Sequence, residues 1–377
     1  MSRVRVVVAG LGDAGVLAAL HLARHRTLVE VVGISARPGL VSGQELGLRL
    51  ARPDAWAREY RVPFDRFRGL DGVRTVHASL TGLDLTQRRV HLRTAAGEQA
   101  SEPYDVLVVA TGVANGFWRH GTLERADELD EALAAAHARV AAARTVAVVG
   151  GGAAAVATAA QLAQVQRASV VTLYFPGEHA LPHHHRRVWA QVRARLERLG
   201  VRLRPGHRAV LPPEVERGEE TGPGEGPVRF STGQEPVDAD AVVWAVGRVR
   251  PHTAWLPPEL LDEQGFVQVD PTLQVPGQAD VWAVGDVAAT DPLRTSARNQ
   301  GGQLVARNVV ATVRGRPARA YRPPRRRWGS VLGPMDDGLV VFTPGGRGVR
   351  IPRRVVDHAL QPWVVRRGIY RGIRATR

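Results

Sequence analysis

Two glycine-rich turns, each between an apolar strand and a helix of small residues, most constrain the fold of this chain. The first turn, GLGDAG at residues 10–15, follows the apolar run VRVVVA and opens the helical pattern VLAALHLARH. In a GxGxxG turn the first glycine permits the tight turn, the second lets the backbone approach a pyrophosphate, and the third lets helix pack on strand. The helix N-terminus offers free N–H groups to phosphates. We therefore predict a dinucleotide site at residues 10–15.

The second turn, GGGAAA at residues 150–155, follows the strand pattern TVAVV and precedes another helix and the strand SVVTLY. Ala155 takes the third glycine position, which governs helix packing rather than phosphate approach. The alternative is a repeat that has lost its ligand. Phe175 follows the last strand, where an acid or an arginine would indicate NADH or NADPH. The predicted nicotinamide contacts are Gly150, Gly152, Ala153, Ala155 and Gly247.

The acid that binds a ribose in such units is not at its usual place in the first unit. Glu30 lies inside the second strand, LVEVVGIS, whereas Ser35 ends it and Arg37 follows. Either Glu30 contacts the ribose, or Ser35 and Arg37 do.

The order of these patterns predicts an α/β fold with two Rossmann-like dinucleotide-binding domains, the second inserted in the first. We expect a first dinucleotide-binding domain at 1–112 and 247–313, a second at 113–246, and a basic C-terminal segment at 314–377. Alternating strands around 75–94 predict a small antiparallel meander. We also expect a helix near 186–199 and a strand pair around 328–351.

Composition excludes several kinds of chemistry. The chain has 377 residues and no cysteine, which excludes disulfide reductase chemistry and Cys-ligated metals. All 51 basic residues are arginine, so no lysine can form a Schiff base. His183, His184 and His185 are adjacent and cannot all face one ion, so a loop or helix start is favoured and no metal site is predicted. Without a charged leader and apolar plateau at its start, the chain is expected to be cytoplasmic.

The charge is concentrated at one end. Residues 314–377 contain 16 arginines and three aspartates, a net charge of +13, whereas the whole chain carries +15. A basic end implies an anionic partner. Trp363 and Tyr370, interleaved with arginines, suit the interface of an anionic membrane. Phosphate contacts with nucleic acid and a plain solvated terminus are the alternatives.

The motifs VAGLGDAG, DVLVVATG, VVGGG, AVVWAVGRVRPHT and VWAVGD, in this order, resemble the FAD-dependent pyridine nucleotide-disulphide oxidoreductase superfamily. The resemblance covers roughly residues 3–312. Without cysteines, the chain looks most like the branch of type II NADH dehydrogenases and apoptosis-inducing-factor-like quinone reductases (ferroptosis suppressor protein). This implies FAD and NAD(P)H as cofactors, hydride transfer from NAD(P)H to flavin N5, and electron transfer to a quinone.

The resemblance also implies individual contacts. Arg49 matches a flavin-contacting arginine, the Leu80 backbone contacts adenine, and Asp286 accepts a hydrogen bond from the ribityl chain. A helix starting near 296–300 would aim its N-terminus at the flavin. In the nicotinamide motif, Ala157 replaces a usual glutamate, which weakens the case for NAD(P)H. The complete set of FAD contacts is Gly10, Gly12, Asp13, Ala14, Gly15, Ser35, Arg49, Leu80, Thr111, Gly112, Gly285, Asp286, Gln300 and Gly301.

The leading interpretation is an FAD-dependent NAD(P)H oxidoreductase on the inner face of the cytoplasmic membrane, with a quinone as the small-molecule acceptor. A second interpretation is a reductase of a protein acceptor such as ferredoxin, docked by the basic end. A third is a non-catalytic flavoprotein that binds nucleic acid or a partner through that end.

Overall fold

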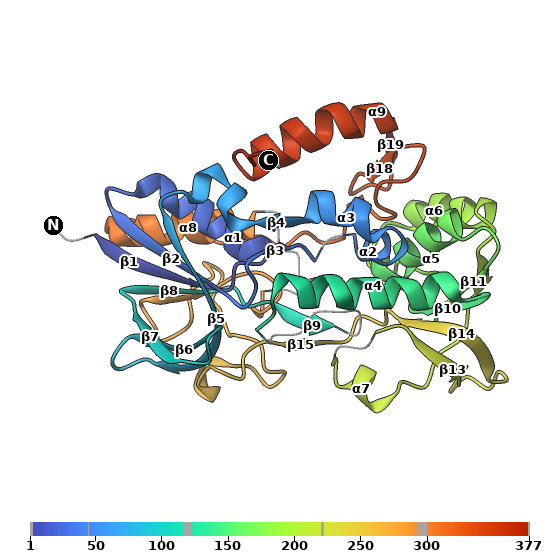
Figure 1. Cartoon of the computed structure of the whole chain (residues 1–377), viewed down its shortest axis with the longest axis horizontal. Coiled ribbons are helices and arrows are strands. Elements are labelled where there is room, and N and C mark those ends of the chain that lie inside the picture. Colours follow the sequence, from blue (N-terminus) through green and yellow to red (C-terminus); the bar gives the residue numbers. More distant parts are fainter. Residues whose placement is uncertain are drawn as a thin grey trace.

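The computed structural model describes residues 3–43, 45–115, 123–219, 222–290, 293 and 300–375, which form two large sheets with helices packed on them (Figure 1). The predicted α/β class with two Rossmann-like units is confirmed. The first sheet has seven strands in the order β16-β8-β1-β2-β5-β6-β7. Its strands are β1 (Val4–Ala9), β2 (Val29–Ser35), β5 (Val73–Asp84), β6 (Arg89–Thr94), β7 (Gln99–Pro103), β8 (Val106–Val109) and β16 (Val281–Ala283).

The centre of this sheet is parallel and buried on both faces, which explains why its strands are continuous apolar runs. β1 pairs with β2 on one side and β8 on the other. Helices α1 (Asp13–Leu22) and α8 (Gly301–Val313) contribute to the core on one face, and residues 255–288 to the core on the other. The predicted meander is β5-β6-β7, which is antiparallel and extends the same sheet.

The second sheet has five strands in the order β12-β11-β10-β14-β13. Its strands are β10 (Thr145–Val149), β11 (Val170–Tyr174), β12 (Arg202–Arg204), β13 (Gly224–Val228) and β14 (Val237–Trp244). The helices of this unit are α4 (Ala126–Ala142), α5 (Ala153–Val165), α6 (Arg186–Arg198) and the short α7 (Pro213–Glu216). α6 lies where the sequence predicts it, and His185 caps its N-terminus by accepting a hydrogen bond from the Arg187 amide at 3.2 Å.

Two crossings of the chain join the units. β9 (Val113–Asn115) leaves the first unit and pairs antiparallel with β15 (Val249–Pro251), which returns to it. Nearby, α2 (Leu46–Ala51) packs tightly on α5, because a Cβ at Gly47 would lie 2.7 Å from the Ala157 carbonyl carbon. The first unit also contains α3 (Pro53–Tyr60) and the pair β3 (Gly39–Val41) and β4 (Arg61–Pro63). Its short 3-10 helices are Ala23–His25, Phe64–Arg66, Arg68–Leu70 and Pro258–Leu260. The predicted boundaries at 112/113 and 246/247 stay a prediction.

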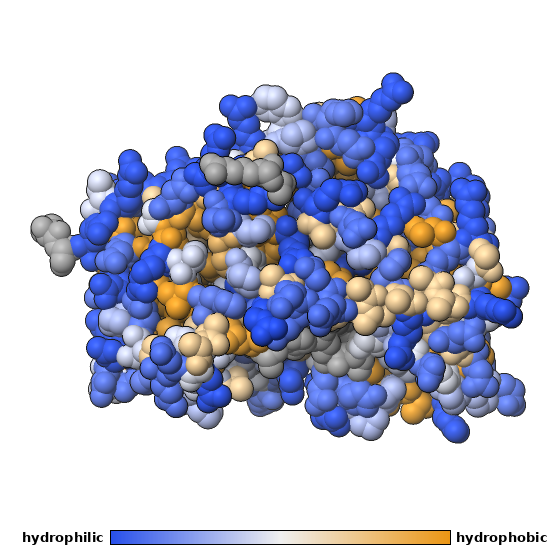
Figure 2. Space-filling model, in the orientation of Figure 1, coloured by the Kyte–Doolittle hydropathy of each residue, from blue (hydrophilic) through white to orange (hydrophobic). Residues whose placement is uncertain are grey.

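The basic C-terminal segment is folded rather than a solvated tail. It forms three short strands where the sequence predicts two: β17 (Gly329–Ser330), β18 (Leu339–Phe342) and β19 (Gly348–Ile351). α9 (Arg353–Val355) then continues as a π-helix, Val356–Ile369. We call residues 353–369 the C-terminal helix; it lies at the top of Figure 1, and hydrophilic residues dominate that region of Figure 2.

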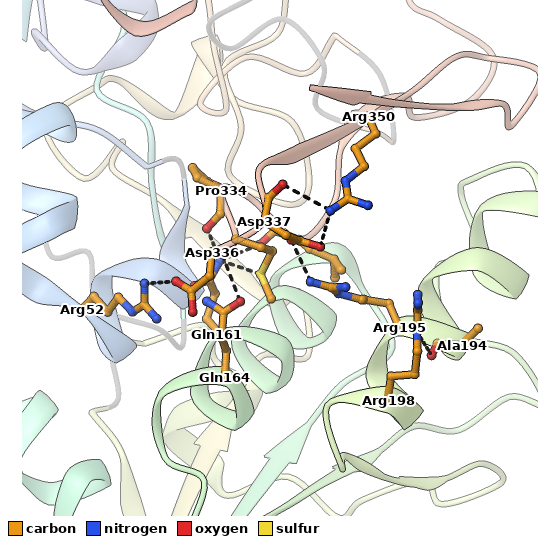
Figure 3. Close-up of polar contacts among 12 residues, drawn as sticks. Arg52, Gln161, Gln164, Ala194, Arg195, Arg198, Pro334, Asp336, Asp337 and Arg350 are labelled. Carbon is orange, nitrogen blue, oxygen red and sulfur yellow. Dashed lines mark hydrogen bonds and ion pairs between the residues drawn. The ribbon is translucent and has the colours of Figure 1, made fainter. Parts of the chain in front are cut away.

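Polar contacts hold this segment on α5 and α6 of the second unit and on Arg52 of the first (Figure 3). The Gln161 side-chain amide, on α5, donates to the carbonyl oxygens of Leu332 and Pro334 at 2.8 and 2.9 Å. Two neighbouring aspartates form ion pairs with arginines of the body, Asp336 with Arg52 and Asp337 with Arg195, both at 2.7 Å.

The end of the segment returns to the first unit. Tyr370 is 2% exposed and its ring meets Phe67 edge-on, with centroids 5.5 Å apart. Arg374 pairs with Asp71 at 2.6 Å. The segment therefore bridges both units. Within the described residues, no helix combines the length and the apolar composition needed to cross a membrane.

Candidate functional site

Both glycine-rich turns and the C-terminal segment line one continuous cavity of about 1810 Å³. A pocket for one small ligand measures roughly 300–1,000 Å³, so this cavity has room for more than one. The first turn meets it at residues 10–14, and the second at residues 151–154. The two units therefore face a common space, and ligands on the two turns would meet in it.

The first turn has the geometry that a pyrophosphate site requires. Gly10 has φ +101°, and a Cβ there would lie 2.5 Å from the Ala110 carbonyl oxygen. A Cβ at Gly15 would lie 1.8 Å from the Gly10 carbonyl oxygen, so only glycine lets α1 start this close to the strand. A Cβ at Gly12 would meet nothing within 4 Å, because Gly12 borders the open cavity. These three environments match the three glycine roles of a dinucleotide turn.

Asp13 shapes the wall of the cavity beside this turn. Its carboxylate accepts hydrogen bonds from the Ser42 hydroxyl at 2.7 Å and the Gly43 amide at 2.8 Å. Both carboxylate oxygens of Asp13 therefore bind residues 42–43 and hold them in place.

The residues of the two ribose alternatives at β2 differ in their access to the cavity. Glu30 does not line the cavity and pairs with Arg5 at 3.7 Å. Ser35 and Arg37 do line it. The Ser35 hydroxyl accepts a hydrogen bond from the Arg37 amide at 3.1 Å, and the Arg37 guanidinium forms an ion pair with the buried Glu124. Ser35 and Arg37 therefore lie where a ligand in the cavity can reach them, and the contact with a ribose stays a prediction.

Other predicted FAD contacts also reach the cavity. The Thr111 hydroxyl donates to the His252 carbonyl oxygen at 2.9 Å, which ties the end of β8 to the strand returning from the second unit. The predicted residues of this group that line the cavity are Ala14, Leu80, Thr111, Gly112, Gly285 and Asp286. Their roles in FAD binding stay a prediction.

Four of the predicted FAD contacts do not line the cavity: Gly15, Arg49, Gln300 and Gly301. Arg49 is 2% exposed, and its guanidinium lies over the Trp56 ring, 5.3 Å from the centroid. Gln300 is exposed, while Gly301 is buried at the start of α8. α8 approaches α1 closely here, since a Cβ at Gly302 would lie 2.6 Å from the Ala14 carbonyl oxygen. The predicted helix start at 296–299 lies outside the described residues.

The second turn reproduces the first. Gly150 has φ +142°, and a Cβ there would lie 2.2 Å from the Ala245 carbonyl oxygen. Gly152, like Gly12, borders the cavity, and a Cβ there would meet no atom within 4 Å. Ala155 is fully buried and fills the third glycine position. The predicted residues Gly152, Ala153 and Gly247 line the cavity, whereas Gly150 and Ala155 form the turn behind it.

Ala157 lines the cavity with a methyl group at the position where the resemblance implies a glutamate. It is 7% exposed, and its backbone touches α2 at Gly47. The substitution removes a charge from the second unit's side of the cavity and leaves the turn itself intact.

Two parts of the site are not among the residues predicted from the sequence. Arg208 lines the cavity from the loop after β12, and no local motif marks it. The C-terminal segment supplies an apolar wall, made of Val331, Leu339, Val356, Leu360, Val365 and Ile369. Apolar positions along 356–369 were a signal for this wall.

His184, which also lines the cavity, makes the fold sensitive to acid. Burial, with smaller effects of Arg327 and His183, lowers its pKa from 6.5 to about 4. The unfolded chain therefore binds an extra proton between these values. The stability that the neutral ring contributes is complete above pH 6.5 and is lost as the pH falls toward 4.

Between pH 7 and pH 4.5, we expect the melting temperature of the wild type to fall by about 3 °C more than that of His184→Gln. Thermal unfolding followed by circular dichroism at both pH values measures this difference. His91→Gln, at an exposed histidine of β6, is the control and should follow the wild type. Equal pH dependence of all three proteins would contradict the assignment.

Two dinucleotide turns on one cavity define the class of oxidoreductases that use a flavin and a nicotinamide dinucleotide together. The comparison with protein families agrees: residues 4–309 match the family of pyridine nucleotide-disulphide oxidoreductases. The chain belongs to this family. FAD and NAD(P)H are its cofactors, and the geometry of both turns fits them.

Known relatives are similar over most of the chain. An NADH dehydrogenase-like protein of Mycobacterium tuberculosis is 29% identical, covering 90% of this chain and 88% of the relative. The type II NADH:quinone oxidoreductase of the same organism is 25% identical, covering 83% of this chain and 73% of the relative. Among solved structures, a ferredoxin reductase from Rhodopseudomonas palustris shares the fold with a TM-score of 0.63 and 20% identity, covering 84% and 78% of the two chains.

Proposed function

We propose that this chain transfers electrons from NAD(P)H through FAD to a quinone at an anionic membrane surface. When bound, FAD supplies the acceptance of hydride and the stepwise release of electrons. The residues of this chain bind the two cofactors on facing turns and leave one further wall of the cavity free for an acceptor.

The observation that carries the proposal is the apolar character of that wall. The C-terminal helix contributes Val356, Leu360, Val365 and Ile369 to the cavity, which together form a lining suited to a large apolar molecule. Gln361 of the same helix also lines the cavity and can donate a hydrogen bond to a quinone oxygen, while the quinone ring and its apolar tail gain from burial against the four apolar side chains.

The outer side of the same helix supports the location at a membrane. Trp363 is 60% exposed and Val364 is 51% exposed, although both are apolar. The Arg367 guanidinium lies over the Trp363 ring, 4.9 Å from its centroid. Exposed aromatic and aliphatic side chains among arginines suit the headgroup region of an anionic bilayer. One helix would thus contact the bilayer on one side and the acceptor on the other.

The experiment that tests the proposal is anaerobic reduction of the holoprotein followed by a screen of acceptors. NADH and NADPH are mixed separately with the protein while the flavin band near ~450 nm is followed. The reduced protein is then offered a short-chain quinone or a ferredoxin. Faster reoxidation by the quinone supports the proposal, and preference for ferredoxin favours a protein acceptor. Flotation with phosphatidylglycerol and phosphatidylcholine vesicles tests the membrane surface separately.

Two neighbouring valines provide a matched test of the apolar wall. Val365 lines the cavity, whereas Val364 lies on the outer side of the same helix. We expect Val365→Asn to raise the KM for the quinone about 10-fold and to leave flavin reduction by NAD(P)H unchanged, because a polar group now faces the acceptor. Val364→Asn should leave both steps unchanged.

Steady-state kinetics with varied quinone and stopped-flow reduction measure the two steps. Because Val365 also packs against the core of the first unit, Leu360→Asn serves as a second variant of the wall. If both wall variants have a wild-type KM for the quinone, the acceptor does not bind at this wall.

A further inference from the structure

Phe175, the residue that follows β11, cannot determine whether NADH or NADPH binds, because its side chain faces away from the cavity. Phe175 is 1% exposed, and its ring meets Trp189 edge-on with centroids 5.5 Å apart. In a dinucleotide-binding unit, the ribose of the adenosine lies at the end of this strand. Whichever side chain approaches that position from elsewhere in the fold therefore decides between NADH and NADPH.

Residues 206–208 run beside the end of β11. The Gly206 amide donates to the Gly177 carbonyl oxygen at 3.2 Å, and the His207 amide donates to the Phe175 carbonyl oxygen at 3.0 Å. The next residue, Arg208, is fixed through its backbone: its amide donates to the Thr232 hydroxyl at 3.0 Å. These bonds hold Arg208 at the predicted ribose position.

Neighbouring residues of this loop face opposite ways. The His207 ring packs against Tyr174 and Phe230, with centroid separations of 5.6 and 4.9 Å, on the core side of the sheet. Arg208 lines the cavity together with Gly151, Pro176 and Gly177. Its side chain is exposed, and no carboxylate among the described residues pairs with it. The charge of Arg208 is thus available to a ligand.

The second unit offers positive charge to the cavity and, among its described residues, no negative charge. The three carboxylates that line the cavity are Asp13, Glu45 and Asp286, all from the first unit. Among the described residues of the second unit, Arg208 is the arginine that lines the cavity. A carboxylate would favour the two ribose hydroxyls of NADH, whereas an arginine near the ribose accommodates a 2′-phosphate.

We propose that Arg208 binds the 2′-phosphate of the coenzyme, so that this chain prefers NADPH to NADH. The inference rests on the proposed use of a nicotinamide dinucleotide at the second turn. A planar guanidinium forms two parallel hydrogen bonds with phosphate oxygens, which gives both affinity and selectivity. The Mycobacterium tuberculosis relatives described above carry NADH in their names, so the preference would separate this chain from them.

The test compares ligands with and without the 2′-phosphate. Isothermal titration of the holoprotein with adenosine 2′,5′-bisphosphate and with 5′-AMP measures the adenosine end alone and needs no turnover. We expect the bisphosphate to bind at least about 10-fold more tightly to the wild type, and Arg208→Ala to remove this difference. Arg202→Ala, which removes the same charge from an exposed position of β12 outside the cavity, is the control and should bind as the wild type does.

Stopped-flow reduction of the flavin completes the test. We expect NADPH to reduce the wild type at concentrations about 10-fold lower than NADH, and Arg208→Ala to weaken NADPH while leaving NADH within about twofold. Equal affinity of the wild type for both adenosine ligands, or an equal loss for both in Arg208→Ala, would overturn the inference. If neither coenzyme reduces the flavin but the bisphosphate still binds through Arg208, the proposed function fails and this inference stands.

Discussion

Gly12→Val is expected to lose FAD while keeping its fold. Gly12 has φ −75° and ψ −166°, an extended conformation that any residue adopts, and a Cβ there would meet no protein atom within 4 Å. The free space belongs to the cavity, where the second glycine of the turn lets the backbone approach the pyrophosphate. A valine side chain would fill this space. We expect FAD affinity to fall at least about 100-fold, or roughly 2.7 kcal/mol.

The ratio of flavin to protein absorbance after purification, and a reconstitution titration with FAD, measure this loss. The melting temperature of Gly12→Val should equal that of the wild-type protein stripped of FAD. Gly72→Val is the control, because Gly72 is exposed, lies away from the cavity and also has room for a Cβ. Wild-type FAD affinity in Gly12→Val would place the pyrophosphate elsewhere.

The sequence was sufficient to predict the two central sheets and both turns because their determinants are local. β1 and β10 are short apolar runs buried on both faces, and each leads directly into a glycine turn and a helix of small residues. α6 follows from its alternation of buried apolar and exposed arginine residues and from a histidine cap. None of these elements depends on knowing which distant segment packs against it.

The C-terminal segment was predicted from its charge, and its fold could not be derived in the same way. The residues that face the cavity, Val356, Leu360, Val365 and Ile369, are separated by four, five and four positions. This spacing drifts away from one face of an α-helix, but the i→i+5 hydrogen bonds of a π-helix keep residues four or five apart on a common face. Many of the arginines that dominate the composition lie on the other side, as the exposure of Arg353, Arg354 and Arg367 illustrates.

The resemblance predicts contacts from positions within motifs, but the orientation of each side chain decides whether it faces the cavity. Leu46 at the start of α2 lines the cavity, whereas Arg49, three residues later, faces Trp56. Arg208 lines the cavity although no motif marks it, because a loop 33 residues beyond Phe175 brings it to the end of β11. Contacts between segments distant in sequence therefore decide which of these side chains line the cavity.

Gly152→Val is expected to impair reduction by NAD(P)H while FAD stays bound, so it tests the two turns separately. Gly152 has φ −85° and ψ 177°, precedes α5, and borders the cavity with no atom within 4 Å of a Cβ, as Gly12 does for α1. Since the first turn is untouched, we expect the variant to purify yellow with wild-type FAD content. A valine here would fill the space of the nicotinamide coenzyme's pyrophosphate, so reduction by NAD(P)H should require at least about 100-fold more coenzyme.

Stopped-flow reduction measures this effect, and dithionite provides the control, because a chemical reductant needs no coenzyme site and should bleach the flavin of Gly152→Val as it bleaches the wild type. Reduction by NAD(P)H at the wild-type rate would mean that the coenzyme does not bind at the second turn. The second unit would then be a repeat of the first that has lost its ligand. Loss of both FAD and reduction would instead show that the two units do not bind their cofactors independently, since α2 and α5 are packed so closely at Gly47. Only the combination of full flavin content and impaired reduction assigns one dinucleotide to each turn.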